Sequence, residues 1–467
     1  MLPSMRRRRL IASWLLLCLT VPLVTTLTAD MLVRRATSLW STDNASEALE
    51  LLQRSADLSI WRSSRWELLA RAALSSGAAA RAETAMQAVR SPSLEGYLTL
   101  ALAQLQQHRL DDAEATLREA ADAYGWSAPI RWQLALLYRQ AGHYDLERAA
   151  LRELVQTDPS DAAAFYRMGL LGLVMDPEPS TGELETASAL DVSYSDAVRT
   201  IRVTIDEASV LRAGSARWIT LGRGLGLVGE WELARHAFSA ATQMDRRNGE
   251  AWAWLGESLQ HLGEDGRAAL DEAAARSGRS AVVHGLRGLY WQRLGQFATA
   301  LEEFVAAAEL EPENPIWHQS IGALQVVAGD LSAALSSYQE AAQIAPHDAA
   351  VWRQLAAFCA KNHMNVEDVG LPAAVRSAAL GPTDPASVAT LGWLYAVTGR
   401  YTLAERRLRQ ALQLDDSDQL TRLRLAEVLL AQGREAESQT LLLSVISMQP
   451  DPTVVERAAQ LLSTMVP

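Results

Sequence analysis

The residues of this sequence that could do chemistry are few and scattered. Gly224, Gly226 and Gly229 have the GxGxxG spacing of a dinucleotide-binding loop. Such a loop needs a strand before it and a helix after it. Here a capped helix that opens at Gly214 to Trp218 precedes the motif, so we interpret Gly229 as a turn glycine between two helices. The motif therefore predicts no nucleotide site.

The eight histidines do not form a metal-binding pattern, because no two of them have HxxxH or HExxH spacing on one helix. His284 and His318 occupy equivalent positions 34 residues apart and could stack on each other. Two histidines alone leave a zinc site incomplete. We therefore favour a packing role, in which each imidazole fills a position that tryptophan takes elsewhere, over a metal pair.

The remaining reactive groups are equally isolated. Cys18 lies in an apolar run and Cys359 in an expected helix, so they give neither a disulfide framework nor a zinc pattern. Asn44 opens a glycosylation sequon with Ser46, but it also fits the cap of a helix that begins near Ala45. There is no GxSxG, Walker or DxD motif, and no Cys/His pairing suited to nucleophilic catalysis. The sequence predicts no enzyme, no cofactor and no metal.

A period of 34 residues organises the chain that must position these groups. Pro312, Pro346, Pro382 and Pro450 are spaced 34, 36 and 68 residues apart. This period is typical of a helix-turn-helix unit with the pattern W-x2-L-G-x2-Y, then A-x3-F, then P. One copy reads Gly288, Gly295, Ala300, Phe304, Ala307 and Pro312. Six copies from residue 218 onward agree at many positions, and weaker copies precede them.

In this pattern the sequence resembles the tetratricopeptide-repeat family from about residue 36 to residue 467. The resemblance implies an all-α, right-handed superhelical solenoid of antiparallel helix pairs with a concave groove. We expect a degenerate array over 33–190, an interrupting helix over 191–213 and a second array over 214–467. Three places depart from the pattern: Glu147 stands where a small alanine is expected, and loops at 176–183 and 363–371 interrupt two copies.

The first residues predict a membrane anchor. A basic segment, 1–9, carries Arg6 to Arg9 and precedes an expected transmembrane helix or signal anchor over 10–32. Its uncharged run, 10–29, has the ~20 residues that a helix needs to cross the hydrocarbon. The arginine bias predicts that the repeats lie outside the cytoplasm. In the alternative, a signal peptide is cleaved after Ala29 and the product is secreted or periplasmic, although Leu27 stands where a small residue is wanted.

Several side chains depart from the structural positions of the repeat and project in the directions that line the family's groove. They come from the first helix of several copies. These candidates are Trp132, Tyr166, Arg223, Trp254, Glu257, Arg353, Trp393 and Glu427. Family members that bind chaperone tails use a Lys and Asn clamp at these positions, and this sequence lacks it. We predict that the groove binds a segment of a partner protein.

Charge and composition narrow the function further. The formal net charge of −12 argues against nucleic acid as a ligand, because phosphate backbones repel an acidic surface. Lys361 is the only lysine, which we interpret as the mark of a GC-rich bacterial genome. We predict a membrane-tethered scaffold for partner proteins in envelope biogenesis, secretion or surface-polysaccharide assembly. The alternatives are a carbohydrate-binding or polysaccharide-export module, and an accessory subunit of a membrane enzyme complex.

Overall fold

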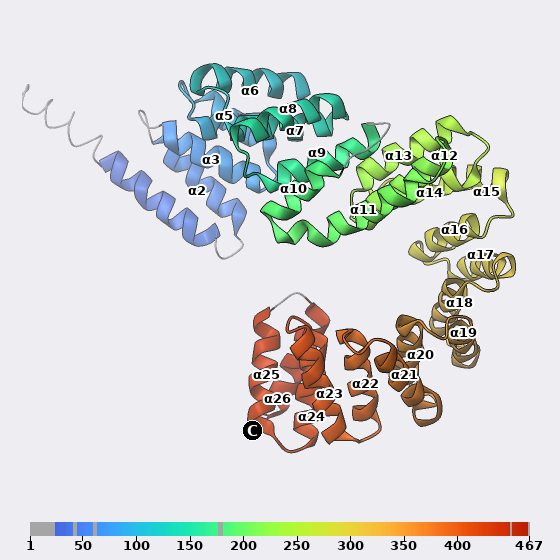
Figure 1. Cartoon of the computed structure of the whole chain (residues 1–467). Coiled ribbons are helices and arrows are strands. Elements are labelled where there is room, and N and C mark those ends of the chain that lie inside the picture. The colour runs from blue at the N-terminus through green and yellow to red at the C-terminus, as the bar shows by residue number, and fades with distance from the viewer. Residues whose placement is uncertain (1–23, 41–43, 59–62, 176–180, 449–450, 466–467) are drawn as a thin grey trace, which may run out of the picture. The chain divides into compact units, whose positions relative to one another are not determined.

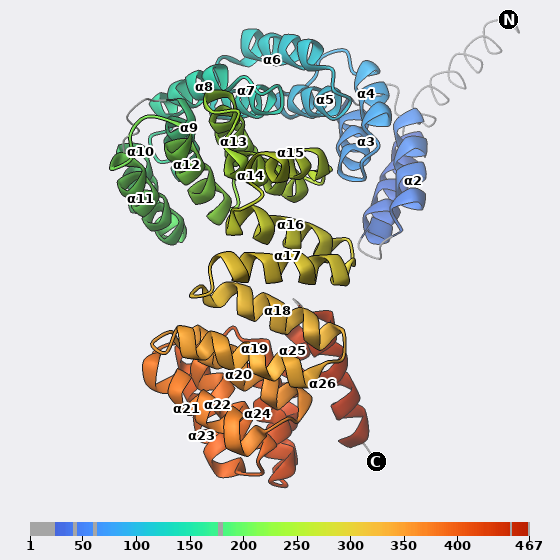
Figure 2. The same ribbon diagram turned by 90° about the vertical axis from the view of Figure 1, so that its right-hand side faces the viewer.

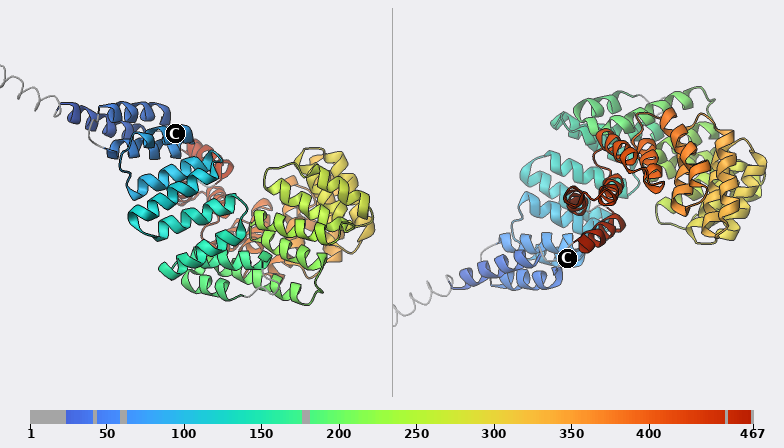
Figure 3. Two further views of the ribbon diagram at one scale, coloured as in Figure 1. Left: turned by 90° about the horizontal axis from the view of Figure 1, so that it is seen from above. Right: turned by 90° about the horizontal axis from the view of Figure 1, so that it is seen from below.

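A computed structural model describes residues 24–40, 44–58, 63–175, 181–448 and 451–465. Within these residues every secondary-structure element is a helix, and successive helices form antiparallel pairs (Figure 1). The chain divides into two compact units, Met1–Glu207 and Ala208–Pro467. The predicted all-α repeat architecture is therefore confirmed in each unit, and Figures 2 and 3 show the same pairing from further directions.

The described part of the first unit opens with a helix over residues 24–40 and continues in pairs of short helices. Its next helices are α2 (Ala45–Asp57), α3 (Ser63–Ser75), α4 (Ala79–Gln87), α5 (Leu94–Gln106), α6 (Leu110–Tyr124), α7 (Ala128–Gln140), α8 (Tyr144–Thr157), α9 (Ala162–Met175) and α10 (Gly182–Leu190). A 3₁₀ turn, η1 (Val192–Tyr194), leads into α11 (Ser195–Ser209), which lies where we expected a helix that interrupts the period.

The second unit contains the more regular copies. Its helices are α12 (Ser215–Leu227), α13 (Trp231–Met244), α14 (Gly249–His261), α15 (Arg267–Ser277), α16 (Ala281–Arg293), α17 (Phe297–Leu310), α18 (Pro315–Val327), α19 (Leu331–Ile344), α20 (Ala349–Asn362), α21 (Leu371–Leu380), α22 (Pro385–Val397), α23 (Tyr401–Leu414), α24 (Gln419–Ala431), α25 (Glu435–Met448) and α26 (Pro452–Met465). A π-helical turn, η2 (Val366–Gly370), lies between α20 and α21.

A glycine facing a large side chain holds each regular pair together. A Cβ added at Gly222 would lie 2.5 Å from the ring of Phe238, and one added at Gly288 would lie 2.8 Å from the ring of Phe304. Both phenylalanines are essentially fully buried. The core is therefore a layer between the two helices of each pair, and its close packing depends on the missing Cβ.

The turn inside each pair needs a left-handed residue, which the sequence supplies as glycine in most copies. Gly229 and Gly329 have φ of +82°, and Gly295 has +72°. Glycine adopts this conformation without the steric penalty of a Cβ. In the α5–α6 pair the same place is taken by His108, with φ of +59°. The turn geometry thus tolerates a non-glycine residue at one copy.

Two expected close-approach positions differ in the structure. The 34-residue period predicts the close contact between α14 and α15 at Ala268, but Ala268 is exposed. The contact lies at Gly266, whose added Cβ would lie 2.2 Å from the carbonyl oxygen of Gly256. In the α7–α8 pair, Glu147 is fully buried and accepts hydrogen bonds from Arg139 (2.9 Å) and Arg167 (2.7 Å). A carboxylate can replace the small alanine at this position because two guanidinium groups neutralise its charge.

The expected anchor falls only partly within the described chain. Residues 1–9 and 10–23 lie outside it, whereas residues 24–32 belong to the helix that continues to residue 40. This helix packs against α2 and α3, with Ala29 and Ala36 almost completely buried. Within the described residues, no helix combines the length and the apolar character that a membrane crossing requires.

Candidate functional site

Trp254 and Arg223, both predicted to line the groove, lie against each other on α14 and α12. The guanidinium carbon of Arg223 lies 5.4 Å from the centre of the Trp254 ring, within the range of a cation–π contact. A second aromatic neighbour of the indole is Phe238, whose ring centre is 5.8 Å away. Trp254 is thus half-buried, and a large part of its surface serves packing between repeats.

Glu257 requires a correction, because its carboxylate is closed off from any groove. The residue is only 5% exposed. It accepts two hydrogen bonds from Arg293 on α16, at 2.5 and 2.8 Å, and lies 3.1 Å from Nε2 of His261. The hydrogen bond to Glu257 raises the pKa of Arg293 although burial opposes this. Glu257 therefore links neighbouring repeats.

Trp393 and Glu427 have partners one helix pair further along the chain. The guanidinium carbon of Arg424 lies 3.9 Å from the centre of the Trp393 ring, and burial lowers the pKa of Arg424 to about 10. Glu427 accepts a hydrogen bond from Nε of Arg457 at 3.2 Å, and both side chains are partly exposed. These contacts run between repeats, as those of Trp254 and Glu257 do.

Arg353 is the predicted groove residue with the least satisfied side chain. Its Nε is buried and has no hydrogen-bond partner among the described residues. Its charge also acts on Asp384, whose pKa is lowered: burial raises this pKa, but hydrogen bonds from Ser387 and the positive charge of Arg353 outweigh burial. Because the Nε of Arg353 is buried, an added group could not reach it without movement of the surrounding side chains.

The two candidates of the first unit also have internal partners. Trp132 on α7 donates from Nε1 to Asp161 at 2.6 Å. Tyr166 on α9 stacks on Tyr194, with ring centres 4.6 Å apart. The helical period predicts the direction in which such residues project, but not which side chain of the next helix covers them.

His284 and His318 have the same structural role in neighbouring repeats. Nε2 of His284 contacts the carbonyl of Gly278 at 3.1 Å, and Nε2 of His318 contacts that of Pro312 at 3.2 Å. The indole N–H groups of tryptophans in the same position donate to the carbonyl six residues earlier in the same way, as in Trp252 and Trp352, both at 3.1 Å. The imidazoles thus replace an indole, and no group of three potential ligands able to hold a metal occurs in the described chain.

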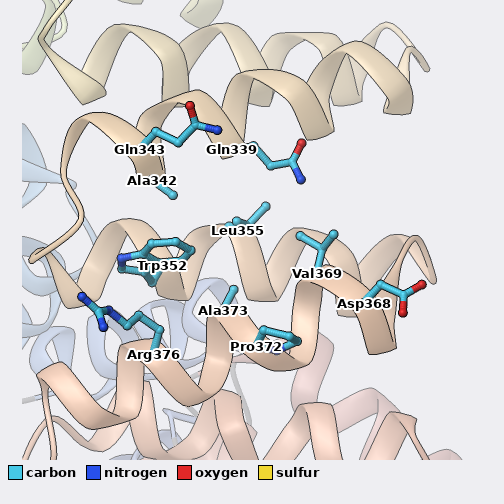
Figure 4. Close-up of a pocket in the computed structure, with 10 residues that line it drawn as sticks. All are labelled: Gln339, Ala342, Gln343, Trp352, Leu355, Asp368, Val369, Pro372, Ala373 and Arg376. Carbon is cyan, nitrogen blue, oxygen red and sulfur yellow. The ribbon is translucent and has the colours of Figure 1, made fainter.

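A hollow that sequence reasoning missed lies between α19 and α21, over α20 (Figure 4). Its volume is about 440 Å³. Trp352, Leu355, Val369, Pro372 and the two alanines form its apolar surface, and polar groups stand around them. The complete lining is Gln339, Ala342, Gln343, Trp352, Leu355, Asp368, Val369, Pro372, Ala373 and Arg376. In Figure 4, Arg376 stands beside Trp352 at one end and Asp368 lies at the other.

The interrupted repeat shapes this hollow. After α20, His363 and Asn365 adopt φ of +50° and +48°, and the chain then forms η2 before α21 begins. Asp368 and Val369, which form one end of the hollow, belong to η2. The departure over 363–371 was visible in the sequence, but its effect on the surface depends on a π-helical turn that the repeat pattern does not predict.

The equivalent tryptophan one hundred positions earlier in the chain, Trp252, has different surroundings from Trp352. There the guanidinium carbon of Arg276 lies 5.0 Å from the centre of the Trp252 ring, while its Nε donates to the carbonyl of Arg246 at 2.6 Å. In the later copy, Arg376 donates to the carbonyl of Pro346 at 3.4 Å, and the ring of Trp352 forms a wall of the hollow. Trp252 thus carries a guanidinium cover, whereas Trp352 lines a space that another group can enter.

Comparison with known proteins identifies the repeat. Residues 98–162, 219–281 and 286–349 match one family described as tetratricopeptide repeat, and residues 378–463 match a second family with the same description. This chain carries tetratricopeptide repeats. The matched stretches include the copies around Trp252 and Trp132. The stretch over residues 378–463 begins just after Arg376, the last residue that lines the hollow.

Among curated proteins, a stretch of 117 residues is 30% identical to Superkiller complex protein 3 of Mus musculus. The match covers 23% of this chain and 7% of that protein, so the chain spans only a small part of its relative.

Three of the solved structures that match this chain serve as examples. They are the APC/C hetero-tetramer Cut9-Hcn1 (15% identity, TM-score 0.40, covering 88% of this chain and 99% of that chain), yeast Tom70 (14%, 0.42, 94% and 95%) and YrrB, described as a tetratricopeptide-repeat protein with an unusual peptide-binding site (16%, 0.33, 41% and 98%).

Proposed function

We propose that this protein is a scaffold that holds a segment of a partner protein in the hollow beside Trp352. The observation that carries this proposal is the difference between two equivalent indoles. Arg276 covers the Trp252 ring, whereas the Trp352 ring lines a hollow with apolar neighbours. Tryptophan is among the residues most often found as binding hot spots in pockets. The repeats supply the framework on which such a site is built.

The lining favours a peptide with an apolar anchor side chain. Trp352, Leu355 and Val369 offer an apolar surface, and the amides of Gln339 and Gln343 can donate to and accept from a peptide backbone. Arg376 and Asp368 provide opposite charges at the two ends. A bound segment would therefore insert an apolar side chain beside Trp352, with an acidic group toward Arg376 and a basic group toward Asp368.

The scaffold is tethered to a membrane in this proposal. The support is the uncharged run over residues 10–29 and the four arginines that precede it. Their bias favours repeats outside the cytoplasm. We therefore assign the protein to envelope biogenesis, secretion or surface-polysaccharide assembly, because these processes bring proteins together at that location. An alkaline phosphatase fusion after residue 467 should be active, and an inactive fusion would reverse this orientation.

Site-specific photocrosslinking of the full chain in its native membrane tests the binding site. A benzoylphenylalanine in place of Gln343 should give an adduct with one partner, which mass spectrometry then identifies. The matched control is the same replacement at Gln243, which is exposed one hundred positions earlier in the repeat with the covered Trp252. Equal adducts at both positions would contradict a specific hollow, and an adduct only at a replaced Arg223 would assign binding to the predicted groove.

Charge substitutions give an independent measurement. Gln343→Glu together with Pro372→Glu places two negative charges at exposed positions of the hollow. The pair should reduce co-purification of the partner that crosslinking identified at least tenfold. The control is Gln243→Glu, which gives the same pair of charges in the copy of the covered Trp252, because Glu272 already provides the second charge there. This control should leave recovery of the partner unchanged. Both variants should melt like the wild type, which separates lost binding from lost folding.

A further inference from the structure

The helix over residues 24–40 is built into the first layer of the repeats through its buried face. Ala29 and Ala36 are 0% and 1% exposed. The hydroxyl of Ser55, on α2, donates to the carbonyl of Ala29 at 2.9 Å. Arg65, at the beginning of α3, donates to the carbonyl of Thr26 at 3.3 Å. The residues that close the uncharged run of the sequence are therefore also structural residues of the first repeat.

The single acidic residue in this part of the helix is neutralised by the same contact. Asp30 forms an ion pair with Arg65 at 2.6 Å, and the Arg65 side chain is only 7% exposed. No other charged residue lies between Arg9 and Arg34. An unpaired carboxylate is strongly unfavourable next to hydrocarbon. The ion pair allows Asp30 to lie close to an apolar phase without an uncompensated charge.

The opposite face of the helix is apolar and exposed. Val24, Leu27 and Met31 are 58%, 56% and 62% exposed. Their spacing of three and four residues places them on one side of the helix, and they are spread over about 10 Å of its length. Arg34 and Arg35 follow in the next turn and are exposed as well. The order is an apolar stripe directly followed by two positive charges.

We propose that this stripe lies in the bilayer and that the first repeat sits directly on the membrane surface, with Arg34 and Arg35 among the lipid headgroups. This inference rests on the membrane tether proposed above. The occupant is lipid because the stripe begins within the twenty uncharged residues that end at Ala29, and because the cations come where the anionic headgroups begin. The end of the uncharged run and the start of the repeats then lie on one helix, residues 24–40, without a linker between them.

The same contacts bear on cleavage of the first residues. A cut after Ala29 would remove the carbonyl groups of Thr26 and Ala29, which accept hydrogen bonds from Arg65 and Ser55. It would also remove Ala29 itself from the buried layer. The first repeat therefore needs the residues that a signal peptidase would discard, which supports a retained anchor.

Lipid-depth quenching tests the proposal on the full chain. Leu27→Cys and Met31→Cys, each in a Cys18→Ser background, are labelled with an environment-sensitive fluorophore and reconstituted in vesicles of phosphatidylcholine and phosphatidylglycerol. Cys359 is buried and should not react. Lipids that carry a nitroxide near the headgroup should quench both labels at least threefold more than a label at Leu227→Cys, which is 78% exposed in the second unit.

The possible results distinguish the membrane contact of the stripe from the retained N-terminal anchor on which it rests. A mature chain that begins at Asp30 by N-terminal sequencing would overturn both. A retained N-terminus with labels at 27 and 31 that are quenched no more than the label at 227 would overturn the membrane seat alone. A disulfide between two copies through Met31→Cys, formed in the membrane, would assign the stripe to a second copy of the chain and would also overturn it.

Discussion

Glu147 shows how one residue can break the repeat pattern and still be stable. Its buried carboxylate is held by Arg139 and by Arg167, which is itself only 4% exposed. Glu147→Ala would restore the consensus alanine, but it would remove the buried carboxylate that Arg139 and Arg167 contact. We expect a loss of about 3–5 kcal/mol in the free energy of unfolding, the range typical of a broken buried pair.

The companion variant makes this expectation specific. Glu147→Ala combined with Arg167→Met removes both buried charges, and an apolar replacement of a buried pair is often close to neutral. Urea denaturation of the wild type, Glu147→Ala and the double variant should therefore give the double variant a clearly larger free energy of unfolding than Glu147→Ala. If the double variant is the less stable of the two, the buried pair does not act as a unit.

His108 makes the complementary residue-scale prediction, because it adopts a left-handed conformation that glycine adopts in most of the other described turns. Its φ is +59°. A side chain in this region typically costs ~1–2 kcal/mol. His108→Gly should therefore raise the free energy of unfolding by about 1 kcal/mol, within the range seen for relieved backbone strain. The imidazole is exposed, so little packing is lost.

The matched change in the opposite direction is Gly329→His. Gly329 has φ of +82° at the equivalent turn between α18 and α19, and no atom lies close enough to contact an added Cβ. Any loss of stability would therefore come from the backbone conformation. We expect the free energy of unfolding to fall by ~1 kcal/mol or more. If both variants melt at the temperature of the wild type, turn conformation does not control stability here.

At the scale of elements, an ion network joins α23 to α25. Glu405, with a side chain 12% exposed, contacts Arg434 and Arg409 at 2.6 Å each. Burial raises the pKa of Glu405, but hydrogen bonds from Arg434 and Gln432 and the two positive charges lower it below its ordinary value. A depressed carboxylate pKa stabilises the fold above the unfolded-state pKa of ~4.3 and loses this contribution as the pH falls through the folded pKa.

Arg434→Met should therefore destabilise the α23–α25 packing at pH 7, and the difference from the wild type should shrink toward pH 3. Urea denaturation at the two pH values measures it. Arg406→Met on the exposed side of α23 is the control and should show no such pH dependence. A difference that stays constant from pH 7 to pH 3 would mean that Arg434 contributes by packing and not through its charge.

The sequence predicted the helix pairs well, because the close-approach residues recur at fixed spacing. Gly222 precedes Phe238 by 16 residues, as Gly288 precedes Phe304. Contacts between repeats could not be predicted in this way. Glu257 pairs with Arg293 across two helices, and both residues are long side chains with several possible partners. The hollow at Trp352 was missed for a related reason, since it depends on η2 and on where one guanidinium group lies.

At the scale of the whole molecule, contacts run between consecutive helix pairs within each unit. α26 packs on α25 and covers Leu442 and Val445, which are fully buried. In repeat arrays, stability is a sum of repeat terms and nearest-neighbour terms, and a terminal helix acts as a cap. Deletion of residues 452–467 should therefore loosen α24 and α25 and leave α12 to α18 unaffected.

Hydrogen exchange followed by mass spectrometry measures this difference. Amides of α24 and α25 should exchange at least tenfold faster in the deleted protein, whereas protection of α14, which begins some two hundred residues earlier, should not change. Uniform loss of protection throughout the second unit would show that its repeats unfold as one cooperative body and would contradict the nearest-neighbour description.

The buried contacts of the helix over residues 24–40 have a mechanical consequence. A flexible tether would absorb tension as an entropic spring, whereas this helix is fastened to α2 and α3 by Ser55 and Arg65. A pull on a partner held by the repeats would then reach the lipid through a stiff joint. The first element to yield would be a helix pair, because each pair is held chiefly by its neighbours. The compliance of the assembly would therefore be set by the strength of single repeats and not by the length of a linker.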